Sequence, residues 1–136
     1  MKKLPLFAPH YTCLEEVLND KNLARLGDAY INFIYSIALS RRIGKATGAK
    51  VSSRVLAQAL KKAELRGFLQ KRMDRHALGD AAEALVAYAY LCGVISIEES
   101  VEALLSADNA AEGFANFLCQ ARERLSFNPA ASEPTL

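Results

Sequence analysis

The chain has 136 residues, of which 51% are hydrophobic, and a formal net charge of +2. This length predicts a single domain with one hydrophobic core. A membrane span is excluded, because Asp28 and Asn32 interrupt the longest apolar run, and a signal peptide is disfavoured by Pro5 and Pro9 in the lysine-containing start. The sequence therefore predicts a cytoplasmic protein.

The three cysteines are Cys13, Cys92 and Cys119, which are widely spaced and lie in apolar helical settings. This odd number and wide spacing favour reduced thiols in the core over a disulfide. Only His10 and His76 could join them, and the spacing of a zinc site is missing.

Positive charge is concentrated in the middle of the chain. Residues 41–75 hold eleven basic residues against two acidic ones, which is +9 and leaves −7 for the rest of the chain. Such asymmetry suits a polyanion such as nucleic acid, although an ordinary solvated face would have the same composition. Phe68 is the one aromatic residue in this segment, so contact with backbone phosphates is favoured over base stacking.

Helical periodicity runs through the chain and no segment alternates like a strand, so the predicted fold is all-α. After an irregular start, Thr12 and Glu15 predict a capping box for a short helix that Asn19 and Asp20 close. Residues 22–43 are apolar nearly all round, which is typical of a central helix. A basic loop follows, and Ser52 or Ser53 then caps a helix that extends to about residue 65.

The second half predicts a short helical segment at residues 68–73 and a second long helix at residues 75–92. Its many alanines would let the helix of residues 22–43 pack closely against it. Ser96 and Glu99 predict a capping box, and Asn109 starts the last helix. Residues 1–127 are therefore expected to form the domain, and residues 128–136 a disordered tail.

One phrase occurs twice, as Leu26-Gly-Asp-Ala and again from Leu78, each time within a long apolar helix. Asp80 and Glu83 share one face if the helix already runs through Asp80. An acid in an apolar helix is costly to bury without a cation, and converging carboxylates are what a divalent metal needs. Together with Asp28, these acids predict a Mg²⁺ or Mn²⁺ site between the two helices.

Asp80 and Glu83 have a second interpretation, in which they are the N-cap and N3 residues of a capping box and bind no metal. This interpretation explains Asp28 poorly, because helix formers precede it from Leu23 and no glutamate follows three residues later. The recurrence of the phrase favours a site. His76, one turn before Asp80, either faces that site or is an ordinary solvated histidine.

The two motifs resemble the signature motifs of the ribonuclease III family. Residues 22–32, Asn-Leu-Ala-Arg-Leu-Gly-Asp-Ala-Tyr-Ile-Asn, resemble the first, and residues 79–91, with Asp-Ala-Ala-Glu-Ala-Leu, resemble the second. The resemblance covers about residues 20–125. It is strongest to the short stand-alone archaeal and mini-III-like proteins, which share the Asp-x-His-x-x-Gly-Asp run seen at residues 74–80.

The resemblance implies a helical endonuclease domain that works as a homodimer on double-stranded RNA with Mg²⁺ and leaves 5′-phosphate and 3′-hydroxyl ends. Asp28, Asp80 and Glu83 match the family's catalytic and metal-binding acids, and we expect Asn32 and His76 beside them. The basic residues expected to bind RNA are Lys45, Lys50, Arg54, Arg72 and Arg75.

One position departs from the family pattern. Full-length bacterial enzymes carry a glutamate where this chain has Ala24, and Lys21 stands one turn further upstream; the mini-III branch also lacks that glutamate. No double-stranded RNA-binding domain is recognisable after residue 125, so the grip on RNA is expected from the domain's own basic surface. Two alternatives follow: a non-catalytic RNA-binding member of the family, or a helical interaction module without a nucleic-acid role.

Overall fold

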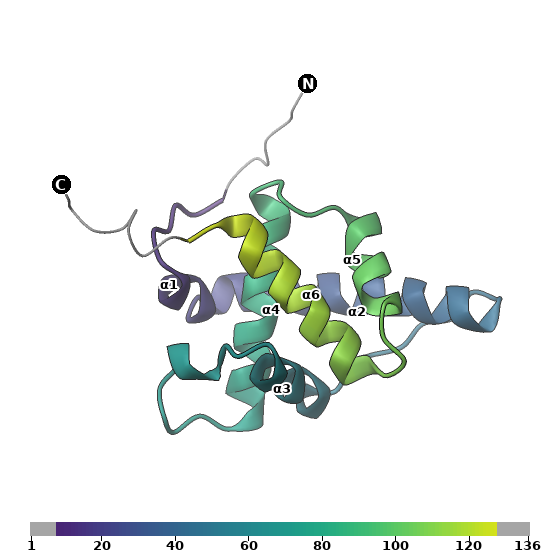
Figure 1. Cartoon of the computed structure of the whole chain (residues 1–136), viewed down its shortest axis with the longest axis horizontal. Helices are drawn as coiled ribbons and strands as arrows, with labels where there is room; N and C mark the ends of the chain where they lie inside the picture. The colour runs from purple at the N-terminus through teal and green to yellow at the C-terminus, as the bar shows by residue number, and fades with distance from the viewer. Residues whose placement is uncertain (1–7, 128–136) are drawn as a thin grey trace.

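The computed structural model describes residues 8–127, in which all regular secondary structure is helical. This confirms the predicted all-α fold. The predicted tail, residues 128–136, lies outside the described residues. In chain order the elements are α1 (Leu14–Leu18), α2 (Lys21–Ile43), α3 (Ser53–Lys62), the 3₁₀ turn η1 (Arg66–Phe68), α4 (Arg75–Leu91), α5 (Ile97–Leu105) and α6 (Ala110–Leu125) (Figure 1).

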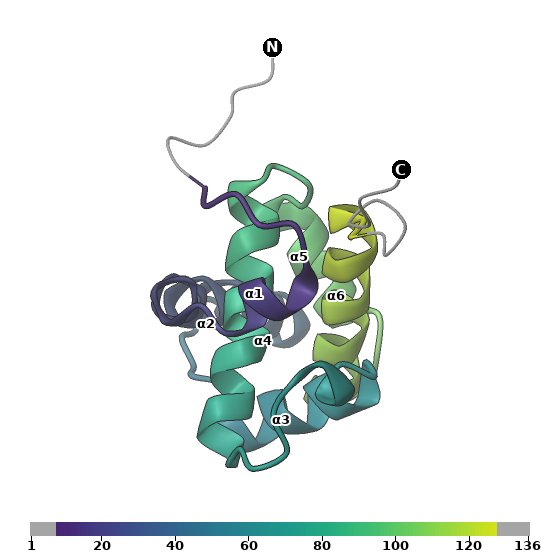
Figure 2. The ribbon, with the colours of Figure 1, turned by 90° about the vertical axis from the view of Figure 1, so that its left-hand side faces the viewer.

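The central helix of the fold is α4. Figure 2 shows it running through the middle of the molecule, with α2 on one side, α6 on the other and α3 at one end. Between residues 78 and 91 every residue is buried except Asp80, Glu83 and Tyr90. The small side chains of this helix let its neighbours pack closely all round. Of the three residues that are not fully buried, two are acids of the predicted site.

As predicted, α2 packs closely along α4, but it is buried on one face only and not nearly all round. One face of α2 packs on α4 and α5, but Leu26 and Phe33 are 42% and 54% exposed on the other side. An apolar helix surface can be left open as well as buried, and periodicity alone does not distinguish the two cases.

The start of α4 rules out the capping-box interpretation of Asp80 and Glu83. The N-cap of α4 is Asp74, whose side chain accepts a hydrogen bond of 2.9 Å from the backbone N–H of Ala77. Asp80 and Glu83 therefore lie well inside the helix, one turn apart on the same face. The N-cap of α2 is Asp20, which accepts from two backbone N–H groups, so it opens α2 instead of closing α1.

The remaining caps are partly as predicted. Ser96 and Glu99 form the expected capping box, and Asn109 caps α6. The predicted box at Thr12 is wrong, because α1 begins after Cys13 without a side-chain cap. The helix expected at residues 68–73 is absent: the single turn η1 ends at Phe68 and residues 69–73 are irregular. Helix α3 ends at Lys62, earlier than expected.

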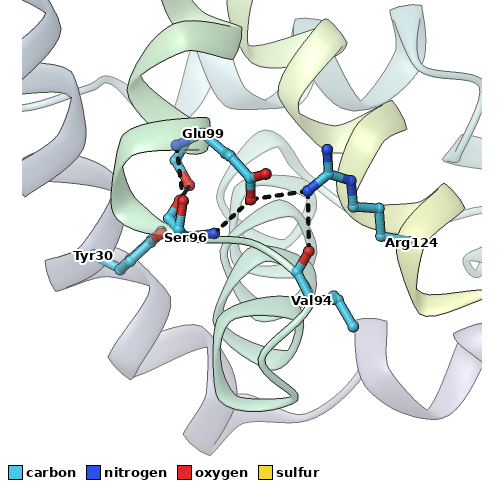
Figure 3. A network of polar contacts seen from close by, with 6 residues as sticks. Tyr30, Val94, Ser96, Glu99 and Arg124 are labelled. Carbon is cyan, nitrogen blue, oxygen red and sulfur yellow. Dashed lines mark hydrogen bonds and ion pairs between the residues drawn. The ribbon is translucent and has the colours of Figure 1, made fainter. Parts of the chain in front are cut away.

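Polar contacts link α5 to α6 near the C-terminal end of α4 (Figure 3). Arg124 pairs with Glu99 at 2.8 Å and donates to the Val94 carbonyl at 3.2 Å, while Tyr30 of α2 lies within hydrogen-bonding distance of Ser100. All three cysteines are free thiols, as predicted, but they are less buried than expected of core residues: Cys119 is exposed, and Cys13 and Cys92 are half-buried. Among the described helices, none has the length and apolarity required to cross a membrane.

Candidate active site

The site is built where α2 crosses α4, and Gly27 makes the crossing possible. A Cβ atom on Gly27 would lie 1.9 Å from the carbonyl oxygen of Glu83 and 2.4 Å from its carbonyl carbon. Only glycine fits so close to another backbone. Because Asp28 follows Gly27 directly, this close approach brings the first acid of the site beside Glu83.

Glu83 is held in an unusually unfavourable place for a negative charge. Burial is the largest influence, followed by the negative charge of Asp28 and a hydrogen bond to it, and together with the charge of Asp80 they raise the pKa of Glu83 to about 8. The positive charge of Lys50 acts in the opposite direction. A cluster of carboxyl groups that keeps a proton near neutral pH is one that a cation would stabilise.

Asp80 has a cationic partner within the chain. Its carboxylate lies 3.6 Å from the ammonium group of Lys21, the first residue of α2. Lys21 stands two helical turns before Asp28 on the same side of α2, and the buried Ala24 lies between them. At the position where a glutamate is expected in full-length bacterial enzymes, this chain thus has the methyl group of Ala24, one turn from the positive charge of Lys21.

The three acids line one cleft of about 630 Å³ between α2, α4 and the start of α3. His76 lines it as well, as predicted for a neighbour of the site. Asn32 lies one turn after Asp28 and donates to its carboxylate at 3.2 Å, so this neighbour is also in place. Arg25 and Ser53 also line the cleft, although neither was predicted for the site. Arg25 precedes Asp28 by three residues and so shares its face, which is the signal that could have identified it.

All five basic residues predicted to bind RNA are exposed. Of these five, only Lys50 lines the cleft. Arg54 is the second residue of α3, Arg75 is the first residue of α4, and Arg72 lies three residues before it. Other basic residues of the positive segment have structural partners instead. Arg42, for example, donates to the Ala107 carbonyl at 2.6 Å.

The donor set fits a hard divalent cation in its chemistry, since all three groups offer carboxylate oxygen. In residues 8–127, however, no three Asp, Glu, His or Cys side chains converge closely enough to hold an ion as they stand. The contacts explain this spread: Asp80 pairs with Lys21, whereas Asp28 is engaged by Asn32 and Glu83. Binding an ion would require these side chains to exchange partners.

A larger hollow of about 820 Å³ lies along α5 and α6. It is lined mainly by glutamates and other polar residues and contains none of the predicted site residues. Its acidic lining would repel the phosphates of a nucleic acid, so the cleft at the crossing is the better candidate.

Comparison with known proteins identifies a family for most of the chain. Residues 21–123 match the family model described as Ribonuclease III. The matched range begins at the first residue of α2 and includes the lining of both the cleft and the hollow along α5 and α6. A search of curated proteins found no match.

Proposed function

The chain belongs to the ribonuclease III family, and we propose that it is a metal-dependent endoribonuclease. Its substrate would be double-stranded or structured RNA, hydrolysed to 5′-phosphate and 3′-hydroxyl ends. The observation that carries the proposal is the cleft in which Gly27 brings Asp28 against Glu83, one turn from Asp80. Carboxylates crowded at a helix crossing, without a structural role of their own, are expected where a cation is used.

Asp28, Asp80 and Glu83 would hold Mg²⁺ or Mn²⁺. When bound, such an ion supplies Lewis-acid polarisation of the phosphodiester and a more acidic water. The chain itself supplies the negative charge that attracts the ion, since Asp28 and Glu83 face each other across the crossing. Asn32 holds the Asp28 carboxylate from one side, and His76 stands at the edge of the cleft, where it can contact a phosphate.

RNA would be held by the exposed basic residues around the cleft. Lys50 lies at the cleft itself, and the predicted contacts Lys45, Arg54, Arg72 and Arg75 have no acid within 4.0 Å among the described side chains, so their charges are available to phosphates. Such contacts read the shape of a duplex more than its sequence.

We further propose a homodimer through the open face of α2. Leu26, Phe33 and Tyr90 are exposed large apolar residues, and Tyr90 lies against Tyr30 of α2 at a ring-centroid distance of 5.0 Å. A symmetric dimer would cover this surface and provide two sites for the two strands of a duplex. Phe33→Glu should shift the protein to the monomer in sedimentation equilibrium.

The cytoplasmic location of the protein also remains a prediction.

The test of the proposal is cleavage of a perfect RNA duplex with Mg²⁺ or Mn²⁺, comparing the wild type with Asp80→Asn and Glu83→Gln. We expect cutting with 5′-phosphate ends by the wild type and its loss in both variants. Glu98→Gln, in the acidic hollow, is the matched control and should cut normally. Salt-sensitive duplex binding without cutting would instead identify a non-catalytic RNA-binding protein, and no binding at all would contradict both functions.

A further inference from the structure

The extended segment of residues 47–51, here called the strap, lies along α2. Three polar side chains of α2, spaced four residues apart on one face, hold it there: Asn32, Ser36 and Ser40. They bond to the backbone of alternate strap residues, in antiparallel order: Val51, Ala49 and Thr47.

Each serine hydroxyl accepts a hydrogen bond from the backbone N–H of its strap residue and lies within hydrogen-bonding distance of the carbonyl oxygen of the same residue. The Ser36 hydroxyl accepts from the Ala49 N–H at 2.9 Å and donates to the Ala49 carbonyl at 3.1 Å. The Ser40 hydroxyl accepts from the Thr47 N–H at 2.9 Å, and its single proton is shared between the Thr47 carbonyl at 3.1 Å and the Ser36 carbonyl at 2.7 Å.

The register follows from two repeat distances. Four residues of α-helix advance by about 6.0 Å, and two residues of extended chain by about 6.6 Å. Because these values nearly match, side chains four apart on α2 meet every second residue of the strap. The residues between, Gly48 and Lys50, are turned away from α2 by the alternation of extended chain, and Lys50 lines the cleft.

Asn32 joins the strap to the site. Its side-chain oxygen accepts from the Val51 N–H at 2.8 Å, which fixes the orientation of the amide because that N–H can only donate. Its NH₂ group then donates to the Asp28 carbonyl at 2.9 Å and to the Asp28 carboxylate at 3.2 Å. One side chain therefore holds a carboxylate of the site and the residue next to Lys50.

We propose that Asn32 is a positioning residue that fixes Lys50 and the Asp28 carboxylate relative to each other, so that Lys50 meets an RNA phosphate beside the acids. The inference rests on the proposed function. A lysine on a free loop would lose both backbone and side-chain freedom on binding, whereas the strap has already ordered the backbone at Lys50. The same amide keeps Asp28 facing the cleft.

A double-mutant cycle tests the link to Lys50. Duplex RNA binding is measured in EDTA, where metal-dependent cleavage cannot occur, over a range of salt concentrations. Lys50→Met should reduce the slope of log affinity against log salt by about one in the wild type, and by less than half as much in Asn32→Leu. Lys45→Met, which removes a lysine outside the strap, is the control and should have the same effect in both backgrounds.

A second readout is Mn²⁺ affinity, followed by electron paramagnetic resonance. Asn32→Leu should weaken Mn²⁺ binding by about tenfold or more, whereas Ser40→Ala, at the far end of the strap, should leave it unchanged. If Asn32→Leu does not fold, Asn32→Ala removes the same hydrogen bonds without adding an apolar side chain.

An equal effect of Lys50→Met in both backgrounds, or an unchanged Mn²⁺ affinity in the Asn32 variant, would overturn the inference. Failure of the proposed function looks different, because the wild type itself would then fail to cut the duplex. If the wild type also bound neither Mn²⁺ nor the duplex, the role of Asn32 would fall with it.

Discussion

The same four residues, Leu-Gly-Asp-Ala, occur in α2 and in α4 in opposite surroundings. In α4, Leu78 is 4% exposed, whereas in α2, Leu26 is 42% exposed. The glycines differ in the other direction. A Cβ on Gly27 would meet a backbone oxygen at 1.9 Å, but a Cβ on Gly79 would make an ordinary contact of 3.5 Å with Ser53.

The difference teaches that a repeated phrase need not mean a repeated role. In α2 the glycine permits the crossing and the leucine faces out. In α4 the leucine fills the core, while the glycine only faces the start of α3. What the two copies share is the aspartate, since Asp28 and Asp80 line the same cleft.

The largest difference is expected between alanine substitutions at the two glycines. Gly27→Ala should destabilise the fold by about 3 kcal/mol, because the new methyl group meets backbone that cannot give way. Gly79→Ala should be neutral or stabilise by up to about 1 kcal/mol, since alanine is the better helix former. Urea unfolding of both variants measures this, and equal stability of the two would contradict the described crossing.

The sequence predicted most of the helices, and it picked out the three acids that line the candidate site, because both leave local signals. The Ser96–Glu99 box and the Asn109 cap are local, and the two motifs identified Asp28, Asp80 and Glu83 without any tertiary information. It could not predict which apolar face stays open, because Leu26 and Leu78 begin the same four residues, Leu-Gly-Asp-Ala. Nor could it predict that Asn32 bonds to Val51, since that contact depends on the path of a loop 19 residues away.

The two leucines should respond in opposite assays. Leu78→Ala should cost about 2 to 4 kcal/mol of unfolding free energy, as for other buried leucines. Leu26→Ala should change monomer stability by less than about 0.5 kcal/mol, but it should weaken the proposed dimer in analytical ultracentrifugation. A normal dimer in Leu26→Ala would place the dimer contact elsewhere.

The acids at the crossing should make the metal-free protein less stable as pH rises. The pKa of Glu83 is raised from 4.5 to about 8, so between these values the folded protein holds a proton that the unfolded chain has released. Stability therefore falls as pH rises from about 4.5 to 8 and levels off above it. Glu83→Gln should flatten this part of the stability profile in EDTA, whereas Glu98→Gln should not.

The smallest effect is expected at Lys21. Its ion pair with Asp80 is largely exposed, so Lys21→Met should change stability by less than about 0.5 kcal/mol. It should nevertheless strengthen Mn²⁺ binding by up to about fivefold, because Asp80 loses a competing cation. Arg25→Met is the matched control, since Arg25 lines the cleft but has no acid within 4.0 Å in the described residues.

The central claim is that the aspartates of the two copies belong to one cation site. Its most direct test is thermal unfolding at pH 8 with and without Mn²⁺ for the wild type, Asp28→Asn and Asp80→Asn. At a hundredfold excess over its dissociation constant, Mn²⁺ should stabilise the wild type by about 2.7 kcal/mol, and each variant should lose most of that gain. If both variants keep it, or if the wild type gains nothing, the two copies do not form a metal site.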